Sequence, residues 1–546
     1  MKKVLLKLLV IPILAAFLLG LAFSASAEAE NDPPFPHPSA LLRQEAPPDL
    51  LTMYDGTPVT TAAQWGERRG ELRALLEYYM YGPFRGGEDD FVSYTINGTQ
   101  TSMSVNIANE TASESFDVGI VLPDTPAPAE GYPFFVVFWG MGGETYALEQ
   151  GYALIRINPG SVATESVSPR GGVFYDLYPY GDTWETQTGN LTALAWGASK
   201  VLDALEAGAA EELNLNMALS IINGNSRWGK AAMVTGAFED RFTVTFPSCS
   251  GTGGAHMWRY DSNGLTFNLL PELEGDPNGV PPIVRFSGRQ SIDSLSGDAN
   301  GSWVNNVFKS FSNAPDRFWA LPVDAHFLAA LTASENRLLF IHSEVNNDWV
   351  GTPGATYTHE LAEPVFKMLG LENNLAINYT MAFHTTTAAD LAKLFAFIDV
   401  NINGAAFNIE NYFSSELSAD ERAFLANFKP EDLKTSFFRS PSNIETYESG
   451  KPVSAVAEIP EAPETPEPPM PEESVEEESI EIAEGSNEPS AESVSDAEPL
   501  PEDLSDLQTA SDSPFINTLS IILIIAGAAL IVLVFVFLIK KKTKTQ

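Results

Sequence analysis

The stretch that decides the fold is Gly224-Asn-Ser-Arg-Trp-Gly-Lys230, "GNSRWGK", which follows the apolar run Met217-Ala-Leu-Ser-Ile-Ile222. It opens into Lys230-Ala-Ala-Met-Val234, a sequence that favours a helix. A strand, a sharp turn that carries a serine, and a helix form the layout of a nucleophile elbow. The usual elbow reads G-x-S-x-G, whereas here the glycine after Ser226 comes one place late, at Gly229. The stretch therefore predicts either a catalytic serine in an unusual elbow or a tight strand-to-helix turn.

Short apolar strands alternate with helix-like stretches around this elbow, from about Asn31 to Arg439. The expected strands are Phe116–Leu122, Phe134–Phe138, Ala153–Ile157, Ala218–Ile222, Phe242–Phe246, Leu338–Ile341 and Ile377–Met381. The expected helices are Ala62–Tyr81, Thr186–Ala207, Lys230–Gly236, Tyr357–Leu369 and Ala388–Asp399. This alternation predicts an α/β fold, a mostly parallel sheet with helices on both faces. Ligands of such sheets bind at the C-terminal ends of the strands, where Ser226 would lie.

The two ends of the chain carry segments of a different kind. Residues 1–27 combine a basic start, an apolar run and Ala25-Ser-Ala27, which indicates a secretory signal peptide. Residues 515–539 form an uncharged apolar run that is long enough for a transmembrane helix. Four lysines lie in the tail 540–546, and the positive-inside rule places that tail in the cytoplasm. We expect a single-pass protein of a bacterial cell membrane, anchored by its C-terminus, with residues 28–440 outside as the catalytic domain.

The charge of the chain is concentrated in one segment. The net charge is −41, yet residues 441–513 alone hold 21 acidic residues and one lysine among Pro, Ser and Ala. Such a composition predicts a disordered linker that lifts the domain off the membrane. Nucleic-acid binding is not expected of an acidic exported chain. Cys249 is the only cysteine, so no internal disulfide can form.

A hydrolytic serine needs a base, and an acid that orients the base. His384 follows the apolar run Ile377–Phe383 and precedes a helix-like stretch, so it is the candidate base. The acid is expected after the preceding strand, where both Glu344 and Asp348 are candidates. The six histidines are scattered without an H-E-x-x-H or C-x-x-C motif, so a metal site is not expected. Hydrolysis by a serine and a histidine requires no cofactor, so none is expected.

Several segments resemble one family in order along the chain. Gly224-Asn-Ser-Arg-Trp-Gly-Lys-Ala-Ala232 resembles the G-C-S-R-x-G-K-G-A elbow of the glucuronoyl esterases, carbohydrate esterase family 15. Further similar segments are Tyr180-Gly181, Thr188–Gly197, Gly236–Arg241, Ser250–Gly254, Trp258-Arg259 and Leu321–Leu331. The resemblance implies an α/β-hydrolase that cleaves esters between 4-O-methyl-glucuronic acid of glucuronoxylan and the alcohols of lignin, at the plant cell wall.

The resemblance also implies roles for individual residues. Ser226 would be the nucleophile and His384 the base, and Arg227 would help to stabilise the oxyanion. The implied substrate-binding residues are Lys230, Gln290, Asp293 and Trp303.

One departure from the family pattern affects the catalytic acid. Many family members carry a glutamate just before S-G-x-G-G, where this chain has Cys249. A thiol cannot stabilise an imidazolium as a carboxylate does, so the acid must come from Glu344 or Asp348, or activity is impaired. Two alternatives to the glucuronoyl esterase therefore remain. The first is another carboxylesterase or acetyl-xylan-type deacetylase, and the second is an impaired domain that binds polysaccharide.

Overall fold

The computed structural model describes residues 33–434 except 45, 87–89, 260–265, 269–282, 286–294, 296–300, 313–318, 346–349 and 381. All of them belong to the first of two units of the chain, Met1–Ile459. The predicted signal peptide 1–27, linker 441–513, membrane span 515–539 and tail 540–546 lie outside the described residues and stay predictions. Among the helices of the described part, none combines the length and the apolar character that crossing a bilayer requires.

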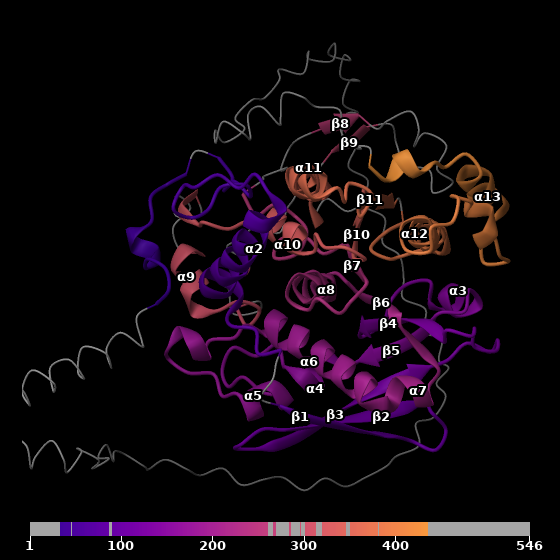
Figure 1. Ribbon diagram of the computed structural model, residues 1–546, viewed down its shortest axis with the longest axis horizontal. Helices are drawn as coiled ribbons and strands as arrows, with labels where there is room; N and C mark the ends of the chain where they lie inside the picture. The colour runs from indigo at the N-terminus through magenta and orange to yellow at the C-terminus, as the bar shows by residue number, and fades with distance from the viewer. Residues whose placement is uncertain are drawn as a thin grey trace, which may run out of the picture. The chain divides into compact units, whose positions relative to one another are not determined.

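A nine-stranded sheet forms the centre of this unit, in the order β1-β2-β3-β5-β4-β6-β7-β10-β11 (Figure 1). Its strands are β1 (Phe91–Ile96), β2 (Ser102–Ala108), β3 (Ser113–Val121), β4 (Tyr132–Phe138), β5 (Ala153–Ile157), β6 (Leu215–Asn225), β7 (Val244–Ser248), β10 (Leu338–Glu344) and β11 (Leu375–Thr380). From β5 to β11 all neighbours are parallel, whereas β1, β2, β3 and β5 pair antiparallel. The expected mostly parallel sheet is confirmed. Strands β8 (Thr266–Asn268) and β9 (Ile283–Arg285) form a separate pair.

Strands β1 and β2 were missing from the expected set for a physical reason. Side chains along β2 alternate strictly between half-buried and buried, because only one of its faces packs on the core. A fully apolar run indicates a strand that is buried on both faces, whereas an alternating strand such as β2 contains polar residues at every second position and has no such run.

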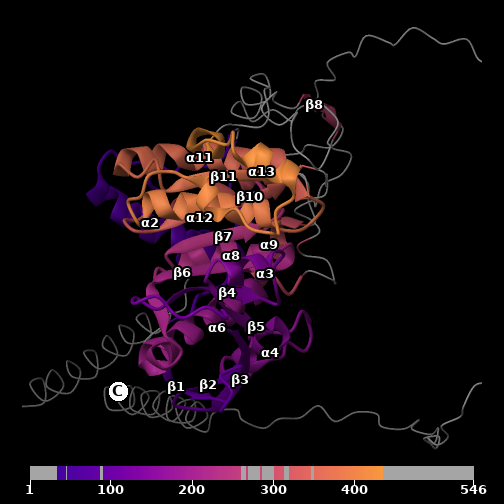
Figure 2. The same cartoon turned by 90° about the vertical axis from the view of Figure 1, so that its right-hand side faces the viewer.

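Helices cover both faces of the sheet, as expected (Figures 1 and 2). One face packs against α6 (Asn190–Ala204), α8 (Arg227–Phe238) and α11 (Thr352–Leu369), and α10 (Ala325–Leu331) and α2 (Ala62–Leu76) add to the same apolar core, α10 on α8 and α11, and α2 on α10. The other face packs against α3 (Glu144–Glu149), α12 (Ala388–Asn401) and α13 (Ala419–Leu425). The remaining helices are η1 (Pro38–Ala40), η2 (Glu77–Tyr81), α4 (Pro159–Val162), α5 (Val173–Leu177), η3 (Trp184–Thr186), η4 (Leu205–Ala209), α7 (Ala210–Glu212), α9 (Asn306–Ser312), η9 (Ile409–Tyr412) and η10 (Pro430–Leu433).

Strand β4 illustrates why the sheet needs two helical layers. Phe134, Val136 and Phe138 belong to the core on the α6 and α8 side, whereas Phe135 and Val137 belong to the core on the α12 side. Successive side chains of a strand point to opposite faces, so an unbroken apolar run requires apolar cover on both. The apolar run at Phe134–Phe138 therefore accounts for the layered α/β architecture.

The strand register aligns the chain segments that carry the candidate catalytic residues. Asn225 of β6 pairs with Ser248 of β7, and Ser248 pairs with His342 of β10. Glu344, the last residue of β10, pairs with Thr380, the last residue of β11. Parallel strands end at the same edge of a sheet, so the loops after these four strands meet there.

Candidate active site

The turn at Ser226 has the geometry of a nucleophile elbow. Ser226 lies between β6 and α8 with φ 60° and ψ −125°, a conformation that a residue with a side chain rarely adopts. Its amide donates to the Ser248 carbonyl at 2.9 Å, and its own carbonyl accepts from the Lys230 amide at 3.2 Å. The strand, turn and helix predicted for this stretch are therefore present, and the half-buried serine lies at the tip of the turn.

The late glycine of the elbow has a packing role. A Cβ atom at Gly229 would collide with the carbonyl oxygen of Ser248. Helix α8 therefore starts so close to the end of β7 that only glycine fits at this position. In the usual elbow, the glycine two residues after the serine allows the helix to approach the sheet closely. Here the glycine three residues after the serine has this role.

His384, the candidate base, is bound by a carboxylate. Its Nδ1 atom lies 2.6 Å from Oε1 of Glu344, and its backbone amide donates to Oε2 of the same side chain. Glu344 is fully buried, whereas the His384 side chain is 30% exposed. Glu344 thus holds both the ring and the backbone of His384, and part of the His384 side chain stays accessible to solvent. Asp348, the other candidate acid, lies outside the described residues.

Three further hydrogen bonds, made by two side chains, hold the loop that carries His384. The Asn225 side chain donates to the His384 carbonyl at 3.1 Å, so the residue before the nucleophile fixes the loop of the base. On the far side of the loop, Asp390 at the start of α12 accepts from the Thr387 amide at 3.0 Å and from the Thr380 hydroxyl at 2.9 Å. The loop is therefore pinned at β6, β11 and α12.

Cys249 lies beside this pair. Its sulfur, a Glu344 carboxylate oxygen and a His384 ring nitrogen all lie within 4.8 Å of one another. Burial, together with the nearby charge of Glu344, raises the pKa of the Cys249 thiol well above its ordinary value. The thiol therefore stays protonated and neutral, and Glu344 supplies the negative charge at this position.

Arg227 and Trp303 meet on a residue that the sequence analysis did not identify. The Glu165 carboxylate accepts from Nη1 of Arg227 at 2.9 Å through Oε2 and from the indole Nε1 of Trp303 at 2.8 Å through Oε1. Trp303 is buried, and the Arg227 side chain is 53% exposed. Glu165 lies in an irregular loop without a recognisable motif, so no signal in the sequence singles it out.

The side chain of Lys230, on α8, is buried and lies next to Trp303. Its Nζ atom donates to the Ser250 carbonyl at 2.5 Å and lies 5.4 Å from the centre of the Trp303 ring. Burial, with a smaller contribution from the charge of Arg227, lowers the pKa of Lys230 to about 7. Lys230 and Trp303 are therefore brought together, whereas Gln290 and Asp293 lie outside the described residues.

The low pKa of Lys230 indicates that the charged form of this buried amine lowers the free energy of unfolding. Between about pH 7 and pH 10.5 the unfolded chain binds a proton at Lys230 that the folded protein does not, so stability rises with pH over this window. At pH 7 and below, the folded protein keeps a charged amine buried. We expect Lys230→Met to raise the melting temperature, by more at pH 6 than at pH 9. Thermal unfolding followed by circular dichroism checks this, with the exposed Lys367→Met as control; equal changes at both pH values would contradict it.

A cavity of about 430 Å³ opens beside the elbow. Its lining includes Asn225, which precedes Ser226, and Thr385, which follows His384; the other lining residues are Trp139, Gly140, Met141, Gly142, Glu144 and Arg156. Most of them belong to the Trp139–Gly143 loop between β4 and α3. This loop is absent from the predicted site, although a glycine-rich turn after a strand and before a helix is a recognisable signal in a fold with a nucleophile elbow.

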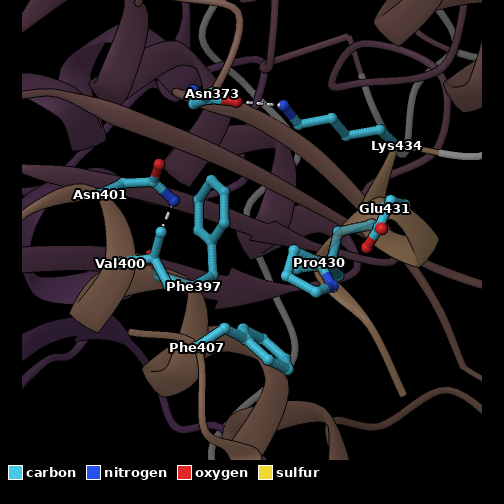
Figure 3. Close-up of a pocket in the computed structure, with 9 residues that line it drawn as sticks. Asn373, Phe397, Val400, Asn401, Phe407, Pro430, Glu431 and Lys434 are labelled. Carbon is cyan, nitrogen blue, oxygen red and sulfur yellow. Dashed lines mark hydrogen bonds between the residues drawn. The ribbon is translucent and has the colours of Figure 1, made fainter. Parts of the chain in front are cut away.

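A second cavity, of about 350 Å³, is lined by residues of α12, η10 and the segments next to them (Figure 3). Phe397, Phe407 and Pro430 face its interior, while Lys434 donates to Asn373 at its rim. None of the predicted site residues in the described part of the chain lines it. Of these two cavities, the one next to Asn225 and Thr385 adjoins the candidate catalytic group.

Comparisons with known proteins find similar sequences in one family of esterases. Residues 105–267 match the family model described as glucuronyl esterase, fungi. A multidomain esterase of Ruminococcus flavefaciens is 32% identical over 421 residues, which cover 76% of this chain and 51% of that protein. The chain thus spans about half the length of that relative. A 4-O-methyl-glucuronoyl methylesterase of Schizophyllum commune is 31% identical over 363 residues, covering 66% of this chain and 83% of that protein.

A solved structure gives the same result for the fold. The glucuronoyl esterase of carbohydrate esterase family 15 from Caldicellulosiruptor kristjansonii is 30% identical, with a TM-score of 0.58. The match covers 70% of this chain and 96% of that chain. The shared region includes nearly the whole of that enzyme, so the likeness extends well beyond the elbow.

Proposed function

Because the chain belongs to the glucuronoyl esterases, carbohydrate esterase family 15, a family of carboxylic ester hydrolases with the α/β-hydrolase fold, we propose that it hydrolyses esters of 4-O-methyl-glucuronic acid. The natural bonds would be those that join glucuronoxylan to lignin alcohols in plant cell walls. The observation that carries the proposal is the Glu344–His384 pair, which the Asn225 side chain ties to the elbow of Ser226.

The chemistry follows from the roles of these groups. His384 takes the proton of Ser226 as the hydroxyl attacks the ester carbonyl, and Glu344 stabilises the imidazolium that forms. Arg227 lies next to the nucleophile and donates to the developing oxyanion. His384 then returns the proton to the departing alcohol, and water releases the uronic acid by the same steps in reverse. Each step uses only side chains of this chain and water.

The sugar part of the substrate is assigned to the group around Trp303. Lys230 lies over the Trp303 ring and Glu165 accepts from its indole, so these two side chains would supply a donor and an acceptor for the sugar hydroxyls. Gln290 and Asp293 stay predicted members of this site. The proposal also keeps the expected location, with the domain held outside a bacterial cell by the C-terminal segment 515–539.

Hydrolysis of defined esters tests the proposal. We expect the purified protein to hydrolyse benzyl glucuronate and its 4-O-methyl form at least tenfold more efficiently, by kcat/KM, than p-nitrophenyl acetate. Ser226→Ala provides the blank, because without the nucleophile only background hydrolysis remains. Turnover of acetyl esters alone would favour an acetyl-xylan-type deacetylase. Binding of glucuronoxylan without any turnover would favour the impaired polysaccharide-binding domain.

A further inference from the structure

Glu165 connects two side chains that the proposed function assigns to different parts of the reaction. Its Oε2 atom accepts from Nη1 of Arg227, beside the nucleophile, at 2.9 Å. Its Oε1 atom accepts from the indole Nε1 of Trp303, in the group assigned to the sugar, at 2.8 Å. The Glu165 side chain is 27% exposed, and a carboxylate accepts about four hydrogen bonds, so a sugar hydroxyl can still reach it. A single carboxylate therefore contacts the oxyanion donor and the sugar group at the same time.

The loop that carries Glu165 and the segment that carries Trp303 are held by one residue. Asn190, at the start of α6, is fully buried. Its side chain donates to the Thr164 carbonyl, directly before Glu165, at 3.1 Å. Its backbone amide donates to the Ser302 carbonyl, directly before Trp303, at 2.7 Å. The fold itself therefore fixes Glu165 and Trp303 relative to each other.

Arg227 is the most exposed member of this group. It is the first residue of α8, and its side chain is 53% exposed. Ordering a long side chain of this kind costs conformational entropy. A donor stabilises an oxyanion best when it is oriented before the charge develops. The ion pair with Glu165 orients the Arg227 guanidinium, which has five N–H donors, and leaves the others for the oxyanion.

We propose that Glu165 is a positioning residue that orients Arg227 toward the oxyanion, and that Trp303 holds Glu165 for this task. The inference rests on the proposed function, in which Arg227 donates to the oxyanion, and adds a residue that acts through Arg227. A sugar that contacts Trp303 or Glu165 then also influences the oxyanion donor. Binding of the uronate would thereby assist the chemical step in addition to holding the substrate.

An ester without a sugar isolates this role. A residue that only binds the sugar leaves the hydrolysis of p-nitrophenyl acetate unchanged. We expect Glu165→Gln to lower kcat/KM for p-nitrophenyl acetate on the order of tenfold, because glutamine has no charge to hold the guanidinium. Trp303→Phe keeps an aromatic ring but removes the indole N–H, and it is expected to lower the same value several-fold.

A double-mutant cycle shows whether Glu165 acts through Arg227. Arg227→Ala alone is expected to lower kcat/KM for p-nitrophenyl acetate about 10²-fold, the scale of one oxyanion donor. In the Arg227→Ala background, Glu165→Gln is expected to change this value less than about twofold, because the side chain that it orients is absent. Glu206→Gln is the matched control, since Glu206 of η4 pairs with Nη1 of Arg241 at the same 2.9 Å, outside the candidate active site.

The outcomes separate this inference from the proposed function. Equal losses from Glu165→Gln with and without Arg227 would overturn it, as would a loss that is confined to glucuronate esters, with melting temperatures equal to that of the wild type. If the wild type hydrolyses p-nitrophenyl acetate but no glucuronate ester, the proposed function fails and the acetate measurements still decide the role of Glu165. A wild type that hydrolyses neither ester would overturn both.

Discussion

Replacing Glu344 by glutamine is expected to lower kcat for glucuronate ester hydrolysis by about 10³- to 10⁴-fold, with little change in KM. The Glu344 carboxylate is fully buried, and its two oxygens contact Nδ1 and the backbone amide of His384. Glutamine keeps the shape but offers an uncharged oxygen and an NH₂ donor, so it neither stabilises the imidazolium nor fixes the correct tautomer. Steady-state kinetics of the purified variant measure the loss.

Cys249 provides the sharpest control for this result. Its sulfur lies within 4.8 Å of the acid and the base, so a carboxylate at residue 249 can reach the same imidazole. We expect the double variant Glu344→Gln/Cys249→Glu to have a kcat at least tenfold higher than that of Glu344→Gln alone. The rescue is expected to be partial, because the fully buried site of Cys249 must accept a larger side chain.

Cys249→Ala alone is expected to stay within a few-fold of the wild type, since the neutral thiol plays no part in the proton transfers. A loss of less than tenfold in Glu344→Gln would show that another carboxylate acts on His384, with Asp348→Asn as the next variant to measure.

Replacing Asp324 by alanine is expected to lower the free energy of unfolding by about 3 to 5 kcal/mol. Asp324 and Arg259 form an ion pair at 2.8 Å, with side chains that are 0% and 1% exposed. Asp324 also accepts from the Trp258 amide at 2.7 Å and caps α10 through the Ala325 amide. Removing the carboxylate leaves a buried guanidinium without its counter-charge. Urea unfolding followed by tryptophan fluorescence measures the loss.

The double variant Asp324→Ala/Arg259→Met distinguishes the charge effect from lost packing. Removing both charges is expected to recover part of the stability, because the uncompensated cation is then absent. The exposed pair Lys367 and Glu363 of α11 is the matched control, at 2.9 Å with 58% and 39% exposure. Breaking that pair is expected to cost less than about 1 kcal/mol. A similar cost for both pairs would contradict the role of burial.

This pair also changes how the family-like segments are interpreted. In the sequence, Trp258-Arg259 and Leu321-Pro-Val-Asp324 are two separate segments that resemble the family. In the structure, Arg259 donates to the Val323 carbonyl at 2.9 Å and to the Leu321 carbonyl, in addition to its contact with Asp324. The two segments are one structural unit that holds the start of α10.

The sequence by itself determined the local elements around the active site. The apolar run before Gly224, the serine and the late glycine were sufficient to predict a strand, a sharp turn and a helix, because hydrophobic runs and turn residues act within a few positions. The loop position of His384, between the run Ile377–Phe383 and α12, could be predicted for the same reason. Unbroken apolar strands likewise implied cover on both faces of the sheet.

Only the tertiary structure decided which side chains lie together. Glu344 reaches His384 because β10 and β11 are neighbours in register, and Glu165 joins Arg227 to Trp303 across 62 and 138 residues of sequence. Cys249 lies beside the acid because β7 ends next to β10. Such contacts depend on the order of the strands and on the paths of irregular loops. Both follow from packing of the whole domain, which short-range patterns in the sequence do not encode.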